Sequence, residues 1–164
     1  KKHSEGRRMD PSHNEEVFGI KRQTIAFIRH GVARHNVLDR HGNPPNLKDP
    51  ELFDPPLVLE GKMQAVEVGE KLRIWWRTTQ VGEYIELVIT SPLTRCLQTT
   101  ALAFHPGEYY TKALPEPTIA CMDLVREAYG MSYPDRRRSL EFLRVSIIDI
   151  CKHEIKRFES VIYS

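Results

Sequence analysis

Three short segments of this chain carry side chains whose types suit phosphoryl transfer. Arg29-His30-Gly31 follows one apolar run, residues 91–95 follow a second, and residues 124–127 follow a third. Arginine can bind phosphate through paired N–H donors, and histidine can carry a phosphoryl group covalently. A carboxylic acid can protonate a leaving oxygen. These residue types together predict phosphoryl transfer through a phosphohistidine, without a metal.

The elements that must position these groups alternate between strands and helices. Residues 24–28 read as a strand buried on both faces of a parallel sheet, and residues 85–90 and 117–122 as two further strands. Strands that alternate with helices predict an α/β fold with a largely parallel sheet. In such a sheet, ligands bind at the carboxyl ends of the strands, where all three segments would meet.

Three helices are expected between and after these strands. The first begins near Leu57, and its apolar positions predict one buried face: Leu59, Met63, Val66, Leu72 and Trp76. Gly61 and Gly69 interrupt this helix, and each could mark a close packing contact. A second helix is expected with Ser91 as its N-cap, Pro92 at its first position and an end near Phe104. The last starts near Ser139.

Four motifs in this order resemble those of the histidine phosphatase superfamily. They are Arg29-His30-Gly31 with Asn36, Asp54-x-Pro56-Leu57 with Gly61 and Gln64-Ala65, Ser91-Pro92-Leu93-x-Arg95-x-x-Gln98-Thr99, and Arg126-Glu127 with Gly130. The match runs from residue 24 to about residue 138 and includes a looser one at residues 135–139. The resemblance implies a phosphoglycerate mutase-like fold, which is a three-layer sandwich with a mainly parallel central sheet flanked by helices.

The resemblance also implies a role for each matching residue. His30 would be the nucleophile, and Glu127 would be the general acid and then the base for water. Arg29 and Arg95 would bind phosphate oxygens, and Asn36 would support the phosphate pocket. The expected function is hydrolysis of a phosphate monoester by way of phospho-His30. A phosphoglycerate mutase is a less favoured interpretation.

A second histidine of the superfamily, usually in a V-T-H-G or V-S-H-G stretch, has no counterpart in this sequence. His153 stands on the expected polar face of the last helix, and we do not assign it that role. We therefore expect a truncated or alternatively spliced form, with a tail at residues 1–23 and the family domain at residues 24–164. The alternative is a weak or inactive isoform that binds phosphorylated ligands or a protein partner.

Composition narrows the remaining classes. The chain has 164 residues, of which 40% are apolar, and 24 Lys and Arg against 22 Asp and Glu leave a formal net charge of +2. This balance gives no electrostatic case for nucleic acid or membrane, so Arg136-Arg137-Arg138 is interpreted as a solvated face or an anion-facing turn. Three widely spaced cysteines fit a reducing cytoplasm. The spacing of His30, His35 and His41 does not indicate a metal site.

The expected partners and cofactors follow from the same reading. The substrate would be a phosphorylated small molecule or a phosphoprotein, with no cofactor required. The resemblance implies that the second histidine stands on a central strand of the family sheet, so a chain without that segment would lack the strand as well. If the last helix does not cover that place, exposed strand edges and apolar surface would favour a homodimer or aggregation.

Overall fold

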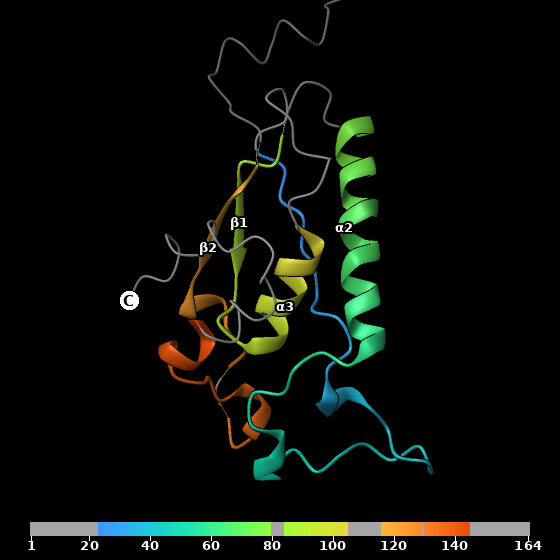
Figure 1. Cartoon of the computed structure of the whole chain (residues 1–164), viewed down its shortest axis with the longest axis vertical. Helices are drawn as coiled ribbons and strands as arrows, with labels where there is room; N and C mark the ends of the chain where they lie inside the picture. Colours follow the sequence, from blue (N-terminus) through green and yellow to red (C-terminus); the bar gives the residue numbers. More distant parts are fainter. Residues whose placement is uncertain (1–22, 80–83, 105–115, 129, 145–164) are drawn as a thin grey trace, which may run out of the picture.

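The chain forms an α/β fold around a short parallel sheet, as the sequence predicts. A computed structural model describes residues 23–79, 84–104, 116–128 and 130–144. In these ranges β1 (Leu87–Thr90) pairs in parallel with β2 (Thr118–Cys121), in a register that runs from Leu87 opposite Thr118 to Thr90 opposite Cys121. Two long helices, α2 (Leu59–Thr79) and α3 (Thr94–Ala103), lie beside one another next to this sheet (Figure 1).

Short turns of 3-10 helix connect these elements. They span Arg34–Asn36, Pro50–Leu52, Asp123–Val125 and Tyr133–Asp135. Three of the turns lie in the segments that follow residue 30 or strand β2, where the sequence places its candidate site. Among the described residues, none of the helices combines the length and the apolar composition needed to cross a bilayer.

The buried face of α2 consists of small residues rather than the predicted large ones. Gly61, Ala65 and Gly69, four residues apart, are buried, whereas Leu59 and Met63 are 74% and 65% exposed. The prediction of a large apolar face was wrong for these two side chains and for Val66, which is 42% exposed, because the buried face lies too close to neighbouring backbone to admit large side chains. The prediction that the two glycines mark close contacts is confirmed by the carbonyls of Val32 and Ala103 that face them.

A small hydrophobic core lies where α2 meets the segment after His30. It consists of Ala33, Leu57 and Ala65, with Leu102 of α3 packed against it. An isolated antiparallel bridge joins Ala33 to Leu57. This contact attaches the loop after His30 to the start of α2, so the core holds the candidate site directly.

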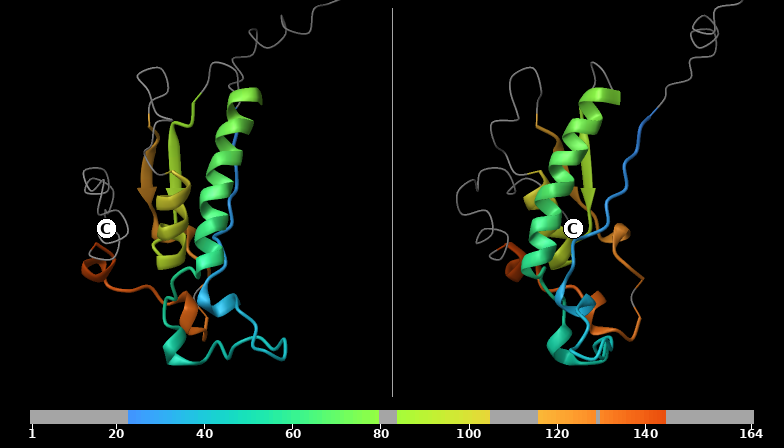
Figure 2. Two further views of the ribbon diagram at one scale, coloured as in Figure 1. Left: turned by 45° about the vertical axis from the view of Figure 1, so that its right-hand side comes forward. Right: turned by 90° about the vertical axis from the view of Figure 1, so that its right-hand side faces the viewer.

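Residues 24–28 do not form the buried strand that the sequence predicts. They run as an extended segment on the side of β1 opposite β2 (Figure 2), but they carry no strand assignment. Ile25 and Phe27 are 70% and 93% exposed. An apolar run reports only a tendency toward burial, and a strand also needs a backbone partner along its whole length.

Helix α3 begins two residues later than predicted. Its N-cap position is Leu93, and Ser91 accepts a hydrogen bond only from the Leu93 amide, at 3.4 Å. The carboxylate of Asp54, which is distant in sequence, supplies the capping contacts by accepting from the Thr94 amide at 2.8 Å and from the Thr94 hydroxyl at 2.7 Å. Asp54 is fully buried and has a positive φ of 43°. The predicted end of the helix near Phe104 is confirmed.

The last predicted helix is described only at its start. Residues 140–144 are helical, with the Leu143 amide bonded to the Ser139 carbonyl at 3.0 Å. The rest of that prediction, which includes His153, and all but residue 23 of the predicted N-terminal tail lie outside the described residues.

Candidate functional site

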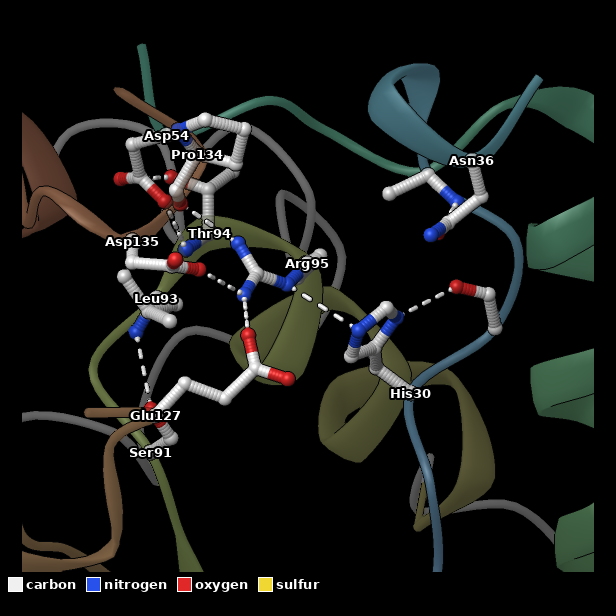
Figure 3. A network of polar contacts seen from close by, with 12 residues as sticks. His30, Asn36, Asp54, Ser91, Leu93, Thr94, Arg95, Glu127, Pro134 and Asp135 are labelled. Atoms are coloured by element: carbon white, nitrogen blue, oxygen red, sulfur yellow. Dashed lines mark hydrogen bonds and ion pairs between the residues drawn. The ribbon is translucent and has the colours of Figure 1, made fainter. Parts of the chain in front are cut away.

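Arg95 lies at the centre of the site and is completely buried. Its Nε donates to His30 Nε2 at 3.1 Å, and its Nη1 donates to the Pro134 carbonyl at 2.6 Å. Its Nη2 donates to Glu127 Oε2 at 2.5 Å and to Asp135 Oδ1 at 3.1 Å. Figure 3 shows the guanidinium between the His30 ring and the side chain of Asp135, with the carboxylate of Glu127 next to the guanidinium. A buried cation is thus held by neighbours on three segments of the chain.

The contacts of His30 fix which ring nitrogen carries the proton. Its Nδ1 lies 2.7 Å from the Gly31 carbonyl, an acceptor, so Nδ1 is the protonated nitrogen. Its Nε2 faces the Nε–H of Arg95 and therefore keeps its lone pair. Burial, followed by the positive charges of Arg95 and Arg29, lowers the pKa of His30 below 6.5, although its bond to Gly31 and the charge of Glu127 oppose the shift. The ring is neutral at neutral pH and presents a nucleophilic lone pair at Nε2.

Two carboxyl groups share the Nη2 atom of Arg95. The Asp135 side chain is 19% exposed and that of Glu127 is 59% exposed. Burial and a hydrogen bond with Glu127 raise the pKa of Asp135. Burial acts in the same direction on Glu127, but the bonds from Asp135 and Arg95 outweigh it, and the pKa of Glu127 is lowered. The first proton that this pair binds therefore belongs on Asp135.

The loop that carries His30 is held by side-chain oxygens from both helices. Thr99 Oγ1 accepts from the Gly31 amide at 3.1 Å, and Gln64 Oε1 accepts from the Val32 amide at 3.0 Å. Gln98 Oε1 accepts from the Leu57 amide at 2.7 Å and so ties α3 to the segment before α2. Polar residues of the sequence motifs thus fix the backbone around His30.

Glycine is required where this loop crosses α2. A Cβ added to Gly31 would lie 2.2 Å from the Gly61 carbonyl oxygen, and one added to Gly61 would lie 2.0 Å from the Val32 oxygen. Both distances are far below van der Waals contact. The two glycines therefore set how closely the loop after His30 approaches α2.

A cavity of about 590 Å³ opens on the same loop. Its charged and polar lining comes from Arg29, His30, His35, Asn36 and Gln64, and none of the lining residues in the described part of the chain is acidic. Arg29 is exposed at this cavity, and Asn36 Oδ1 accepts from the Ala33 amide at 3.1 Å, which orients the Asn36 side chain. A basic and amide-rich lining without carboxylates favours an anionic ligand.

Comparison with known proteins gives one relevant similarity. No family model matches the chain. It is 30% identical over 139 residues to a phosphoglycerate mutase-like protein of Arabidopsis thaliana, and this similarity covers 72% of the chain and 49% of that protein. The chain therefore spans about half the length of the curated relative it matches. This similarity supports the histidine phosphatase superfamily.

The structure brings together the residues that the sequence singled out. His30, Arg95 and Glu127 form one connected network, and Arg29 and Asn36 line the cavity beside His30. The catalytic and binding roles given to these five residues stay predictions. Arg95 differs most from its expected role, because its contacts with protein groups use most of its donors.

Sequence reasoning missed two side chains of this site. Asp135 lies in the segment whose motif match was loosest, and the Tyr133–Asp135 turn places it on Arg95. His35 was considered only as a metal ligand, yet it lines the cavity with His30. Their positions in the sequence could have identified them, because Asp135 directly follows Tyr133-Pro134 and His35 directly precedes Asn36.

The three consecutive arginines after Asp135 contact protein groups. Arg136 stacks on the Tyr133 ring at 4.2 Å. Arg137 lies 3.5 Å from the Asp123 carboxylate. Arg138 packs over Phe142 and donates to the Phe53 carbonyl at 3.1 Å. These contacts explain the basic run as a structural segment that holds the Asp135 turn in place.

Proposed function

We propose that this chain is a phosphatase that hydrolyses a phosphate monoester through a phosphohistidine on His30. The observation that carries the proposal is the fixed tautomer of His30, which turns the Nε2 lone pair toward a buried arginine. The similarity to a phosphoglycerate mutase-like protein supports the same class of chemistry. Hydrolysis is preferred to mutase activity on the ground given by the sequence, which lacks the longer inserts of a sugar-phosphate mutase.

The first half-reaction forms a bond between His30 Nε2 and phosphorus. The lone pair attacks the phosphorus atom while the bond from phosphorus to the ester oxygen breaks. The imidazolium that results keeps its Nδ1–H bond to the Gly31 carbonyl, which helps disperse the new positive charge. For the attack to occur, Arg95 must release Nε2, and its freed Nε–H can then bind a phosphoryl oxygen.

The leaving oxygen needs a proton, and the carboxyl pair on Arg95 is its proposed source. The proton is held on Asp135, whose hydrogen bond to Glu127 allows the more exposed carboxyl of Glu127 to pass it on. Glu127 thus retains the predicted role as the group that meets the substrate, and Asp135 becomes its proton reservoir. General acid catalysis of this kind contributes roughly 10²–10⁴-fold.

The second half-reaction returns His30 to its starting state. Water attacks phosphorus, the bond from phosphorus to Nε2 breaks, and the carboxylate pair takes the proton that the water loses. Inorganic phosphate then leaves from the cavity lined by Arg29 and Asn36. No group outside this chain, its substrate and water takes part.

A binding function without turnover is the second candidate. The contact between Arg95 Nε and His30 Nε2 favours it, because this hydrogen bond occupies the lone pair that must attack. In that case the cavity would bind a phosphorylated ligand, and His30 would only line the cavity without reacting.

Hydrolysis of an aryl phosphate between pH 5 and 8 separates the two candidates. The chain is compared with its His30→Ala variant and with a His41→Ala variant as the matched control, since His41 is exposed and bonds only within its own loop. We expect turnover to disappear in the first variant and to persist in the second. An acid-labile phosphoryl group should be trapped on the native chain and on His41→Ala, but not on His30→Ala. Equal turnover in all three proteins, or none in a folded native chain, would reject the phosphatase proposal.

A further inference from the structure

The cavity beside His30 contains a second imidazole, that of His35. The ring centroids of the two histidines lie 5.8 Å apart at an interplanar angle of 51°. Both line the cavity together with Arg29 and Asn36. A phosphorus atom held about 3–3.5 Å from an attacking nitrogen would place its outer oxygens within reach of a ring at this distance.

The surroundings of His35 identify the nitrogen that carries its proton. Its Nδ1 is buried and has no hydrogen-bond partner among the described residues. A buried N–H group without an acceptor is rarer, and more costly, than a buried acceptor without a donor. The proton therefore resides on Nε2, and the ring offers an N–H donor on its other edge.

His35 also remains uncharged. Burial, followed by the positive charge of Arg95 and by repulsion from His30 whenever that ring is protonated, lowers the pKa of His35 from 6.5 to about 4, although Asp135 acts in the opposite direction. A further cation beside Arg95 and Arg29 would be repelled by them. A neutral ring avoids this repulsion and still donates a hydrogen bond.

The fold itself gains little from an imidazole at this position. The Arg34–Asn36 turn is held by backbone bonds and by the Asn36 side chain, with no contribution from the His35 ring. An unpaired buried polar atom costs about 1–3 kcal/mol, so an apolar side chain of similar size would suit the fold better. The polar edge of His35 is therefore explained by a ligand.

We propose that His35 is a substrate-binding residue that donates an uncharged hydrogen bond to a phosphate group held between it and His30. This proposal rests on the proposed function, because that function identifies the ligand as a phosphate group. A phosphate monoester and free inorganic phosphate both present this group to His35.

Calorimetric titration with inorganic phosphate at pH 7 tests this proposal without requiring turnover. His35→Leu removes the donor, His35→Gln restores one, and His41→Ala is the matched control on the exposed loop that follows. We expect His35→Leu to raise the Kd for phosphate about tenfold or more, in line with loss of one hydrogen bond to a charged group. His35→Gln should recover part of that loss, and His41→Ala should bind as the native chain does.

Three outcomes would overturn the role of His35. They are unchanged phosphate affinity in His35→Leu, no phosphate binding by the native chain, and weak binding in both His35 variants together with lower thermal stability. The last would indicate a structural role. The phosphatase proposal is tested separately: it fails if His30→Ala hydrolyses an aryl phosphate as fast as the native chain. That result would not affect the phosphate titration, which still tests the role of His35.

Discussion

Gly61→Ala is expected to damage the site through the backbone alone. The added Cβ would lie 2.0 Å from the Val32 oxygen and 2.7 Å from the Val32 nitrogen, whereas real Cβ contacts essentially never fall below 3.0 Å. The loop must therefore move from α2 by about 1 Å. Val32 follows Gly31, whose carbonyl accepts the Nδ1–H of His30. A displacement of about 1 Å at a reacting group costs about 100-fold in rate.

The same substitution is expected to lower the free energy of unfolding. Extra atoms in a packed interior cost about 1–3 kcal/mol, and alanine in a helix recovers about 0.5–1 kcal/mol relative to glycine. We expect a net loss of about 1–2 kcal/mol, measured by urea unfolding followed by circular dichroism. The assay of function is hydrolysis of an aryl phosphate, corrected for the folded fraction.

Gly69→Ala is the matched control on the same helix. Its Cβ would lie 2.2 Å from the Ala103 oxygen, a clash of similar size at the contact between α2 and α3 and away from His30. We expect a similar loss of stability, with hydrolysis per folded molecule reduced much less than in Gly61→Ala. If both variants hydrolyse the ester equally well per folded molecule, the close approach of Gly61 to the loop does not position His30.

Three further predictions concern buried polar groups. Asp54→Ala should lower the free energy of unfolding by about 1–3 kcal/mol, because the buried Thr94 amide loses its acceptor. Asp54→Asn should lower it less, and equal urea midpoints for the two variants would refute this prediction. The native chain should lose stability as pH falls from 6.5 toward about 4, because the unfolded chain binds a proton that folded His35 does not. In His35→Gln the free energy of unfolding, measured with urea, should change less over that pH range. An unchanged dependence on pH would show that His35 is not its cause. Asp135→Asn should slow hydrolysis of an ester with a poor leaving group about 100-fold, and should slow hydrolysis of an ester with a good leaving group much less. Equal effects on the two esters would exclude Asp135 as the proton source for Glu127.

The sequence predicted which residues meet at the site better than it predicted the elements that carry them. Strands β1 and β2 and the end of α3 were located correctly, because short apolar runs and helix stop signals are local. The supposed strand at residues 24–28 was wrong, since pairing along a strand depends on a partner distant in the chain. The buried face of α2 was wrong for a similar reason: the loop backbone that lies on Gly61 excludes large side chains there.

The partners of Arg95 could not be predicted from sequence for a different reason. Its motif identified an arginine near phosphate, but four of its hydrogen bonds go to His30, Pro134, Glu127 and Asp135. These residues are 32 to 65 positions away in the sequence. Which of two nearby carboxyls holds a proton depends on their relative burial and on the shared guanidinium, and neither is visible in a list of residues.

The motif residues around His30 divide into those that do chemistry and those that hold the backbone. Gln64, Gln98 and Thr99 each use one side-chain oxygen to accept from a backbone amide of another segment. Each therefore fixes a position without adding charge near the nucleophile. A neutral acceptor suits this task, because a carboxylate at the same place would raise the pKa of His30 and favour its protonated, non-nucleophilic form.

The acidic groups of the site are paired with the guanidinium of Arg95. Glu127 and Asp135 both accept from its Nη2, and the charge of Arg95 opposes the effect of Glu127 on the pKa of His30. When substrate phosphate draws Arg95 Nε away from His30, the guanidinium must keep its carboxyl partners or lose the contacts that hold it buried. In the proposed mechanism the carboxyl pair would therefore anchor Arg95 during the transfer as well as supply the proton. We expect Asp135→Asn to weaken acid catalysis more than it weakens the fold.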